Sequence, residues 1–207
     1  MIENLILDYN GVVSDDFSLV HRTSMRLFQI YGLNPNLTVE EFRNMFEIPA
    51  SRFWEKMLPG VDFDLLNKRY FEIYSEWGSP NIYPQAKETL TSLSSLGVNL
   101  VILSSHLEEK IRAELEGFGI DSCMFTKIYG GVNNKLDVIE QVLRESDFSQ
   151  ETTAYVGDTE HDVETGKKVG VRTIASTYGY RTREQLAKVN PDIFIDTPEG
   201  LLEAVKV

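Results

Sequence analysis

The chain has 207 residues, 42% of them hydrophobic, and a formal net charge of −12. This length suits one α/β domain with a sizeable core or such a domain with a small insertion, and the apolar content argues against disorder. The acidic balance argues against a basic nucleic-acid-binding face, and no apolar run approaches the roughly 20 residues of a membrane span. Because Cys123 is the only cysteine and the first residues lack a signal-peptide pattern, we expect a cytoplasmic protein without disulfides.

Short apolar runs of strand length recur along the chain. Such continuous runs are typical of strands buried on both faces, as in a parallel sheet. From the second run onward, segments with helical character separate them, and two of these segments end at Gly97 and Gly119, which suit helix C-termini. The alternation predicts an α/β fold with a Rossmann-like parallel sheet. The predicted strands are residues 5–7, 100–103, 127–129, 154–156, 172–175 and 193–195, and the predicted helices between them are 87–96, 107–118, 136–145 and 163–169.

Residues 15–82 lack such buried-strand runs and have the pattern of amphipathic helices. Thr38 and Glu41 are spaced as a capping box, which predicts a helix start. We therefore expect a core domain made of residues 1–14 and 83–207, with residues 15–82 inserted as a helical domain and residues 81–84 as the return linker. The other predicted helices of the insertion are 17–31, 51–57 and 63–77.

Polar side chains follow four of the predicted strands. Ligands of open α/β sheets bind outside the carboxyl ends of the strands, so we expect these side chains to converge there. Together they would supply carboxylates, a hydroxyl and an ammonium group, which are the components of a phosphoryl-transfer site. The groups are Asp8-Tyr9-Asn10-Gly11, Ser104-Ser105-His106, Lys135, and Gly157-Asp158-Thr159-Glu160-His161-Asp162.

Ser105 and Glu108 are also spaced as a capping box. This spacing predicts a helix that begins directly behind Ser104. The backbone N–H groups of that first turn would then be available to an anion at the sheet edge.

In their order and spacing, these groups resemble the four motifs of the haloacid dehalogenase (HAD) superfamily. The first motif is an apolar strand followed by Asp-x-Asp-Gly-Thr, and here Asp8 begins Asp-Tyr-Asn-Gly-Val. Ser104 matches the second motif, Lys135 the third, and Asp158 and Asp162 the Gly-Asp-x-x-x-Asp of the fourth. The insertion resembles the C1-type helical cap of the phosphoglycolate phosphatase-like and β-phosphoglucomutase-like branch.

The resemblance implies a role for each matched residue. Asp8 would be the nucleophile, Asn10, Ser104 and Lys135 would complete the catalytic set, and an aspartyl-phosphate would form on Asp8. Mg²⁺ would be the cofactor, held by Asp8, the Asn10 carbonyl and Asp158, with Asp162 and Thr159 behind these ligands. The phosphate would be bound by Asp8, Gly11, Ser104, Ser105 and Lys135. In the cap, Arg52 would contact the substrate.

The chain departs from the family pattern at Asn10, where the family has the aspartate that serves as general acid and base. An amide cannot carry protons in this way, and such a group typically contributes about 10²–10⁴-fold in rate. Three interpretations remain open. A natural variant could use another proton carrier, for which the candidates are Asp15, Asp16, His106, His161 and Glu160. An engineered change and a degenerate, non-hydrolysing protein are the other two.

The favoured prediction is a Mg²⁺-dependent phosphatase of a small phosphate monoester, with a small phosphorylated metabolite as its partner and neither nucleic acid nor membrane. The alternatives are a weak or inactive Mg²⁺/phosphate-binding protein, a phosphomutase and a haloacid dehalogenase-type hydrolase. The chain would be a monomer or a homodimer.

Overall fold

The computed structural model describes residues 1–48, 50–132 and 134–207. The chain divides into two compact units, of which the first consists of Met1–Asp15 and Asn81–Val207 and the second of Asp16–Pro80. The second unit lies inside the predicted insertion of residues 15–82. That this insertion acts as a cap remains a prediction.

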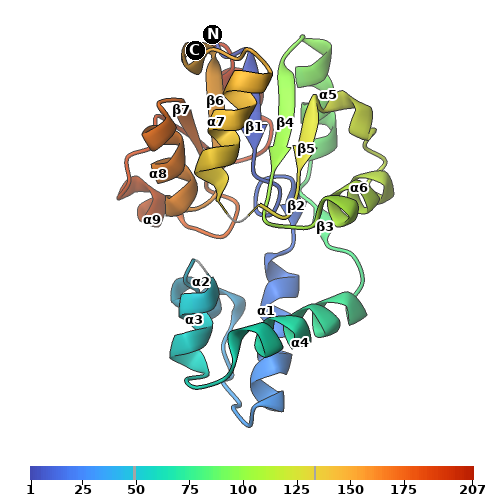
Figure 1. Cartoon of the computed structure of the whole chain (residues 1–207), viewed down its shortest axis with the longest axis vertical. Coiled ribbons are helices and arrows are strands. Elements are labelled where there is room, and N and C mark those ends of the chain that lie inside the picture. The colour runs from blue at the N-terminus through green and yellow to red at the C-terminus, as the bar shows by residue number, and fades with distance from the viewer. Residues whose placement is uncertain (49, 133) are drawn as a thin grey trace. The chain divides into compact units, whose positions relative to one another are not determined.

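The first unit is built on a six-stranded sheet with the order β5-β4-β1-β6-β7-β8 (Figure 1). All neighbouring strands of this sheet run parallel, which confirms the predicted α/β class. β1 lies in the middle of this order, between β4 and β6. The strands are β1 (Asn4–Leu7), β4 (Asn99–Leu103), β5 (Lys127–Tyr129), β6 (Thr153–Gly157), β7 (Arg172–Ser176) and β8 (Ile193–Ile195).

Side chains alternate between the two faces of the sheet along each strand. Because the strands are continuous apolar runs, both faces are apolar. Leu5 and Leu7 point into a core cluster that includes residues of α5 (Ala86–Ser95), α6 (Glu108–Gly117) and α10 (Gly200–Ala204). Ile6 and Tyr155 point the other way, where α7 (Lys135–Glu145) and α8 (Glu160–Val169) pack, and α9 (Arg183–Ala187) joins a smaller cluster with α8. These two helical layers fix where the loops at the strand ends lie.

Some elements of the first unit were not predicted. Asn81–Ile82, expected to be a linker, forms β3 and pairs antiparallel with β2 (Ser14–Asp15). The helices α9 and α10 and the 3₁₀ turns η1 (Ser122–Met124) and η2 (Gln150–Thr152) were also missed. Elements this short carry too few residues for a hydrophobic period to be visible.

The second unit is helical, as predicted. It contains α1 (Phe17–Ile30), α2 (Val39–Met45), α3 (Ala50–Met57) and α4 (Phe63–Glu76). The predicted capping box is confirmed, since Thr38 Oγ1 accepts from the Glu41 N–H and Glu41 Oε2 accepts from the Thr38 N–H. The core of this unit is a group of aromatic rings around Phe53, with centroids 5.0–6.2 Å from its own. They belong to Phe28, Phe42, Phe46 and Trp54.

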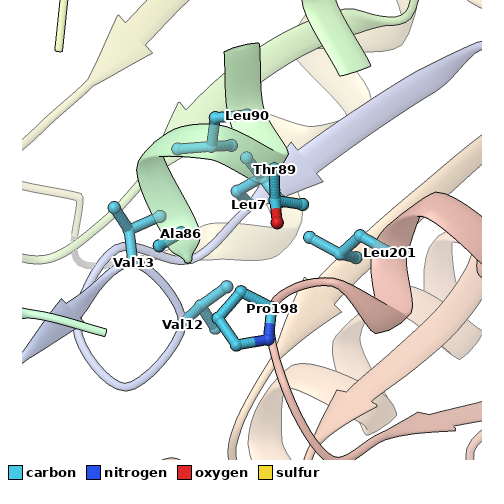
Figure 2. A pocket seen from close by; sticks show the side chains of 8 residues that line it. All are labelled: Leu7, Val12, Val13, Ala86, Thr89, Leu90, Pro198 and Leu201. Atoms are coloured by element: carbon cyan, nitrogen blue, oxygen red, sulfur yellow. The ribbon is translucent and has the colours of Figure 1, made fainter. Parts of the chain in front are cut away.

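A small cavity of about 10 Å³ lies in the apolar core of the first unit, beneath the loop that follows β1. Figure 2 shows the Thr89 hydroxyl among the apolar side chains of Val12, Pro198 and Leu201. This oxygen is buried and has no hydrogen-bond partner among the described residues. The volume is at the lower limit for one water molecule, and an apolar lining offers a water too few partners.

Among the described residues, no helix combines the length and the apolar character needed to cross a membrane.

Candidate active site

Asp8 lies at the carboxyl end of β1, in the middle of the sheet. Its backbone N–H donates to the Val156 carbonyl at 2.9 Å, which fixes the position of the residue against β6. Its side chain is only 11% exposed, with Oδ1 accepting from the Tyr9 N–H at 2.7 Å and Oδ2 from Lys135 Nζ at 2.6 Å. The carboxylate is therefore held by a backbone donor and a cation in a fixed orientation.

Gly11 shapes the loop that follows. Its φ is +77°, and a Cβ built on it would lie 1.9 Å from Asp158 Oδ2. Only glycine tolerates both the left-handed backbone and this close approach. The loop thus comes into direct contact with the fourth motif.

The fourth motif forms the end of β6 and the start of α8. Thr159 is the N-cap, and it forms a capping box with Asp162. A Cβ on Gly157 would lie 2.2 Å from the Asp162 Cβ, so the glycine leaves the space that the Asp162 side chain occupies. Asp158 and Asp162 are each 1% exposed.

Lys135, the first residue of α7, bridges two of these carboxylates. Its Nζ donates to Asp8 Oδ2 at 2.6 Å and to Asp162 Oδ1 at 2.8 Å. The side chain of Lys135 is 13% exposed, so both ion pairs are largely shielded from water. Asp8, directly after β1, therefore meets residues of α7 and α8 that are far away in the sequence.

The pKa values follow from burial and from the charges that face one another. Burial raises the pKa of Asp8 to about 6, against the opposing effect of Lys135. Burial also raises the pKa of Asp158 well above its usual range, and repulsion from Asp162 and Asp8 adds to this. Asp162 is buried as well, yet Lys135 and its hydrogen-bond donors hold its pKa below the usual value. Burial alone would lower the pKa of Lys135, but attraction to the Asp162 and Asp8 carboxylates outweighs this and raises it.

Oxygen atoms of Asp8, Asp158 and Asp162 all lie within 4.8 Å of one another. The three carboxylates carry more negative charge than the single ammonium of Lys135 offsets. Asp162 has its oxygens engaged by Lys135, Tyr155 and Thr159. A hard divalent cation, which prefers carboxylate oxygens, would therefore fit best on the side of Asp8 and Asp158.

Ser104 lies at the end of β4, is 1% exposed, and its Oγ donates to Asn10 Oδ1 at 3.4 Å. This is a long, weak bond, but it places the two residues next to each other. The Ser104 Oγ also accepts from the His106 N–H at 3.1 Å.

The predicted capping box at Ser105 is wrong. Ser105 is exposed, and α6 begins only at Glu108, with Leu107 at the N-cap position and no side-chain cap bond. The residues between are instead held to the loop after β5, because the Gly131 N–H donates to the His106 carbonyl and the Val132 N–H to the Ser104 carbonyl. Such bonds between loops are not visible in a sequence.

The candidate proton carriers His106, Glu160 and His161 differ in their surroundings. His106 Nε2 lies 3.0 Å from Glu114 Oε1, and its ring stacks on that of Tyr9. Glu160 pairs with Arg181 at 2.9 Å. His161 is exposed.

Asp15 belongs to β2 in the first unit, whereas Asp16 and Arg52 belong to the second unit. Arg52 lies exposed on α3. Its predicted contact with a substrate remains a prediction.

A fifth loop, which follows β7, also contributes to the site and was not predicted from the sequence. The Tyr180 N–H donates to Asp158 Oδ2 at 2.6 Å, and a Cβ on Gly179 would lie 2.4 Å from the same oxygen. Ser176 Oγ donates to the Gly11 carbonyl at 3.3 Å, and Tyr178 OH to the Val12 carbonyl at 3.1 Å. The rule that ligands bind beyond strand ends, applied to the fifth predicted strand as well, would have indicated this loop.

Comparisons with known proteins agree with this architecture. The haloacid dehalogenase-like hydrolase profile matches residues 5–176. A phosphoglycolate phosphatase from Synechococcus elongatus is 32% identical over 126 residues, which cover 60% of this chain and 59% of that protein. The pyrophosphatase PpaX from Oceanobacillus iheyensis is 22% identical over 209 residues, covering 99% of this chain and 97% of that protein. The chain thus spans about three fifths of the length of the first curated relatives that it matches.

Solved structures show the same fold. A haloacid dehalogenase-like hydrolase from Streptococcus pneumoniae superposes with a TM-score of 0.83 at 22% identity, over 98% of both chains. A CbbY aspartate-to-asparagine mutant from Rhodobacter sphaeroides, in complex with xylulose-1,5-bisphosphate, has a TM-score of 0.75 at 21% identity and covers 97% of this chain and 96% of that one. With the family profile matched over most of its length, this chain belongs to the haloacid dehalogenase-like hydrolase family.

Proposed function

We propose that this protein is a Mg²⁺-dependent phosphatase that hydrolyses a small phosphate monoester through an aspartyl-phosphate on Asp8. The observation that carries the proposal is the buried Asp8 carboxylate at the end of β1, held by Lys135 and next to the Asp158 carboxylate. A carboxylate in this position can attack phosphorus and split one difficult displacement into two easier ones.

Each residue of the site has a task in this scheme. Asp8 supplies the attacking oxygen and afterwards carries the phosphoryl group. Lys135 offsets the charge that gathers on Asp8 and on the phosphoryl oxygens. The Ser104 hydroxyl donates to one of those oxygens, and Gly11 lets the phosphate-binding loop after β1 lie directly against Asp158.

Asp8, Asp158 and the Asn10 carbonyl would hold the Mg²⁺, with Asp162 and Thr159 behind them. The surplus of buried negative charge and the raised pKa of Asp158 support this choice, because both are relieved by a divalent cation. When bound, the ion supplies electrostatic stabilisation of the charge on the transferring phosphoryl group.

The first substrates to test are named by the relatives. Several curated relatives are phosphoglycolate phosphatases, and another is a pyrophosphatase. We propose a small phosphorylated acid or sugar as the substrate class, and we expect neither nucleic acid nor membrane as a partner.

Asn10 determines which leaving groups the enzyme can expel. It lacks a titratable proton, so leaving groups that need protonation depend on another carrier. His106 pairs with Glu114 at 3.0 Å and Glu160 with Arg181 at 2.9 Å, and Asp15, Asp16 and His161 are the other candidates. The alternative, a protein that binds Mg²⁺ and phosphate with little turnover, rests on the same residue.

The test is steady-state hydrolysis of acetyl phosphate, p-nitrophenyl phosphate, 2-phosphoglycolate and pyrophosphate, each with Mg²⁺ and with a chelator. The parent chain is compared with Asn10→Asp. Acetyl phosphate and p-nitrophenyl phosphate have good leaving groups and need little acid help, whereas 2-phosphoglycolate needs more.

We expect Mg²⁺-dependent turnover of the first two substrates by the parent chain. If no other acid serves, Asn10→Asp should raise turnover of 2-phosphoglycolate by about 10²–10⁴-fold and change acetyl phosphate far less. Equal rates in both proteins would point to a replacement carrier, to be sought by Asp15→Asn, Asp16→Asn and His161→Gln. Absence of turnover in both would overturn the phosphatase proposal in favour of the binding protein.

A further inference from the structure

Tyr155 lies two residues before the fourth motif, and its sequence pattern is that of an ordinary strand residue. Tyr155 lies in the middle of β6 and is 1% exposed. Its hydroxyl nevertheless donates to Asp162 Oδ1 at 2.7 Å. A buried phenol that reaches the site from within the sheet needs an explanation beyond packing.

The strand geometry explains how it gets there. Tyr155 and Gly157 are two residues apart in β6 and therefore point to the same face of the sheet. Gly157 has no side chain, and the Asp162 side chain occupies the space above it. On α8, a Cβ at Gly166 would lie 2.7 Å from Thr173 Cγ2, so this glycine lets α8 lie close to β7, and it would be in ordinary van der Waals contact with the Tyr155 Cβ at 3.5 Å. The phenol hydroxyl thus meets the carboxylate.

This hydrogen bond is one link in a continuous chain. The oxygen that accepts from Tyr155, Asp162 Oδ1, also accepts from Lys135 Nζ at 2.8 Å. Lys135 in turn donates to Asp8 Oδ2 at 2.6 Å, and its Nζ lies 5.9 Å from the centre of the Tyr155 ring. Burial and the neighbouring Asp162 raise the pKa of Tyr155 well above 10, so the phenol keeps its proton and remains a donor.

We propose that Tyr155 is a positioning residue, whose hydroxyl shares Asp162 Oδ1 with Lys135 and thereby keeps the ammonium group placed on Asp8. Without the hydroxyl, Oδ1 would have Lys135 as its closest donor and would draw the ammonium toward Asp162. The inference rests on the proposed function insofar as the placement of Lys135 on Asp8 serves phosphoryl transfer.

The experiment compares Tyr155→Phe with the parent chain and with Tyr129→Phe. The Phe side chain keeps the ring in the core and removes only the hydroxyl. Tyr129 is a matched control, because its hydroxyl also donates to a carboxylate of the first unit, Glu145 Oε2 at 3.3 Å, but away from Asp8.

For Tyr155→Phe, kcat on p-nitrophenyl phosphate with Mg²⁺ should fall about tenfold, while KM should change less than about threefold. Effects of this size are typical of residues that orient the groups in direct contact with a ligand. Tyr129→Phe should retain the parent kcat. A kcat within twofold of the parent in folded Tyr155→Phe would overturn the inference, and so would an equal loss in Tyr129→Phe.

A second measurement is independent of turnover. Urea unfolding of the parent, Tyr155→Phe, Lys135→Met and the double variant forms a double-mutant cycle. If the two side chains act through Asp162, the cost of Tyr155→Phe should be smaller in the Lys135→Met background, by about fivefold or more in the unfolding equilibrium constant. Additive effects would overturn the link. If the parent proved inactive, the proposed function would fail, and this cycle would still decide whether Tyr155 and Lys135 are coupled.

Discussion

The two units of this protein have interiors of opposite character. In the first unit, three buried carboxylates and a lysine are packed at the edge of the sheet, and two of the carboxylates have raised pKa values. In the second, the core is a set of aromatic rings around Phe53. Buried charges are costly unless paired, and replacing them by apolar groups is often neutral or stabilising. The charged site of the first unit therefore lowers the stability of the fold, whereas the aromatic core of the second unit contributes to it.

The largest effect is expected at Asp8. Asp8→Asn keeps the shape of the side chain but removes the nucleophile, and we expect turnover to fall by at least about 10³-fold. The unfolding free energy should fall little or even rise, because one of the crowded negative charges is removed. Asp147→Asn, at an exposed position, is the matched control and should retain the parent rate. Retained turnover in Asp8→Asn would remove this residue from the mechanism.

The aromatic region should show the reverse pattern, with a large loss of stability. Phe53 is fully buried, and Phe53→Ala should cost about 3–5 kcal/mol of unfolding free energy. Both tryptophans, Trp54 and Trp77, lie in the second unit, so fluorescence during urea unfolding follows this unit. Phe71 is 53% exposed, and Phe71→Ala should change the unfolding free energy by no more than about 0.5 kcal/mol. Equal effects at both positions would contradict the aromatic core.

The unfolding free energy of the metal-free protein should depend on pH, because the pKa of Asp8 is raised in the folded state. A carboxyl with a folded pKa of about 6, above its value of 3.8 in the unfolded chain, binds its proton more tightly when folded. Its contribution to stability is present below about pH 4 and is lost as the pH rises through 6, by about 3 kcal/mol in total.

The measurement is urea unfolding in chelator between pH 4 and 7, followed by circular dichroism. Asp8→Asn should lack this part of the pH dependence, whereas Asp147→Asn should retain it. Identical pH profiles for the parent and Asp8→Asn would show that Asp8 does not titrate in this range.

The smallest effect concerns Thr89, an exception within the apolar core of the first unit. Its buried hydroxyl has no hydrogen-bond partner among the described residues, so Thr89→Val should raise the unfolding free energy by about 1 kcal/mol. Thr153 is the matched control, since its equally buried hydroxyl donates to the Ser149 carbonyl at 2.7 Å. Thr153→Val should destabilise by about 1 kcal/mol. Thermal unfolding of the two variants measures both signs, and a loss in Thr89→Val would indicate an undetected partner.

Much of this protein was predictable from the sequence. The apolar runs predicted all six strands of the parallel sheet, and the positions after the strands placed Asp8, Lys135, Asp158 and Asp162 at one edge. These predictions succeed because burial on both faces leaves a continuous apolar signal, and because strand ends of a parallel sheet meet at the same side. The Thr38 capping box, another local pattern, was also correct.

Only the tertiary structure decided the remaining features, because each depends on contacts between distant segments. The Ser105 capping box failed since the loop after β5 binds the residues that would have begun the helix. The contact of the loop after β7 with Asp158 joins residues 22 positions apart. Tyr155 has the sequence pattern of a buried strand residue. Its hydrogen bond to Asp162 arises only because α8 places the Asp162 side chain over Gly157. The sequence by itself determined which chemical groups are present and at which edge, whereas packing determined which atoms meet, since hydrogen-bond partners are chosen by distances in space.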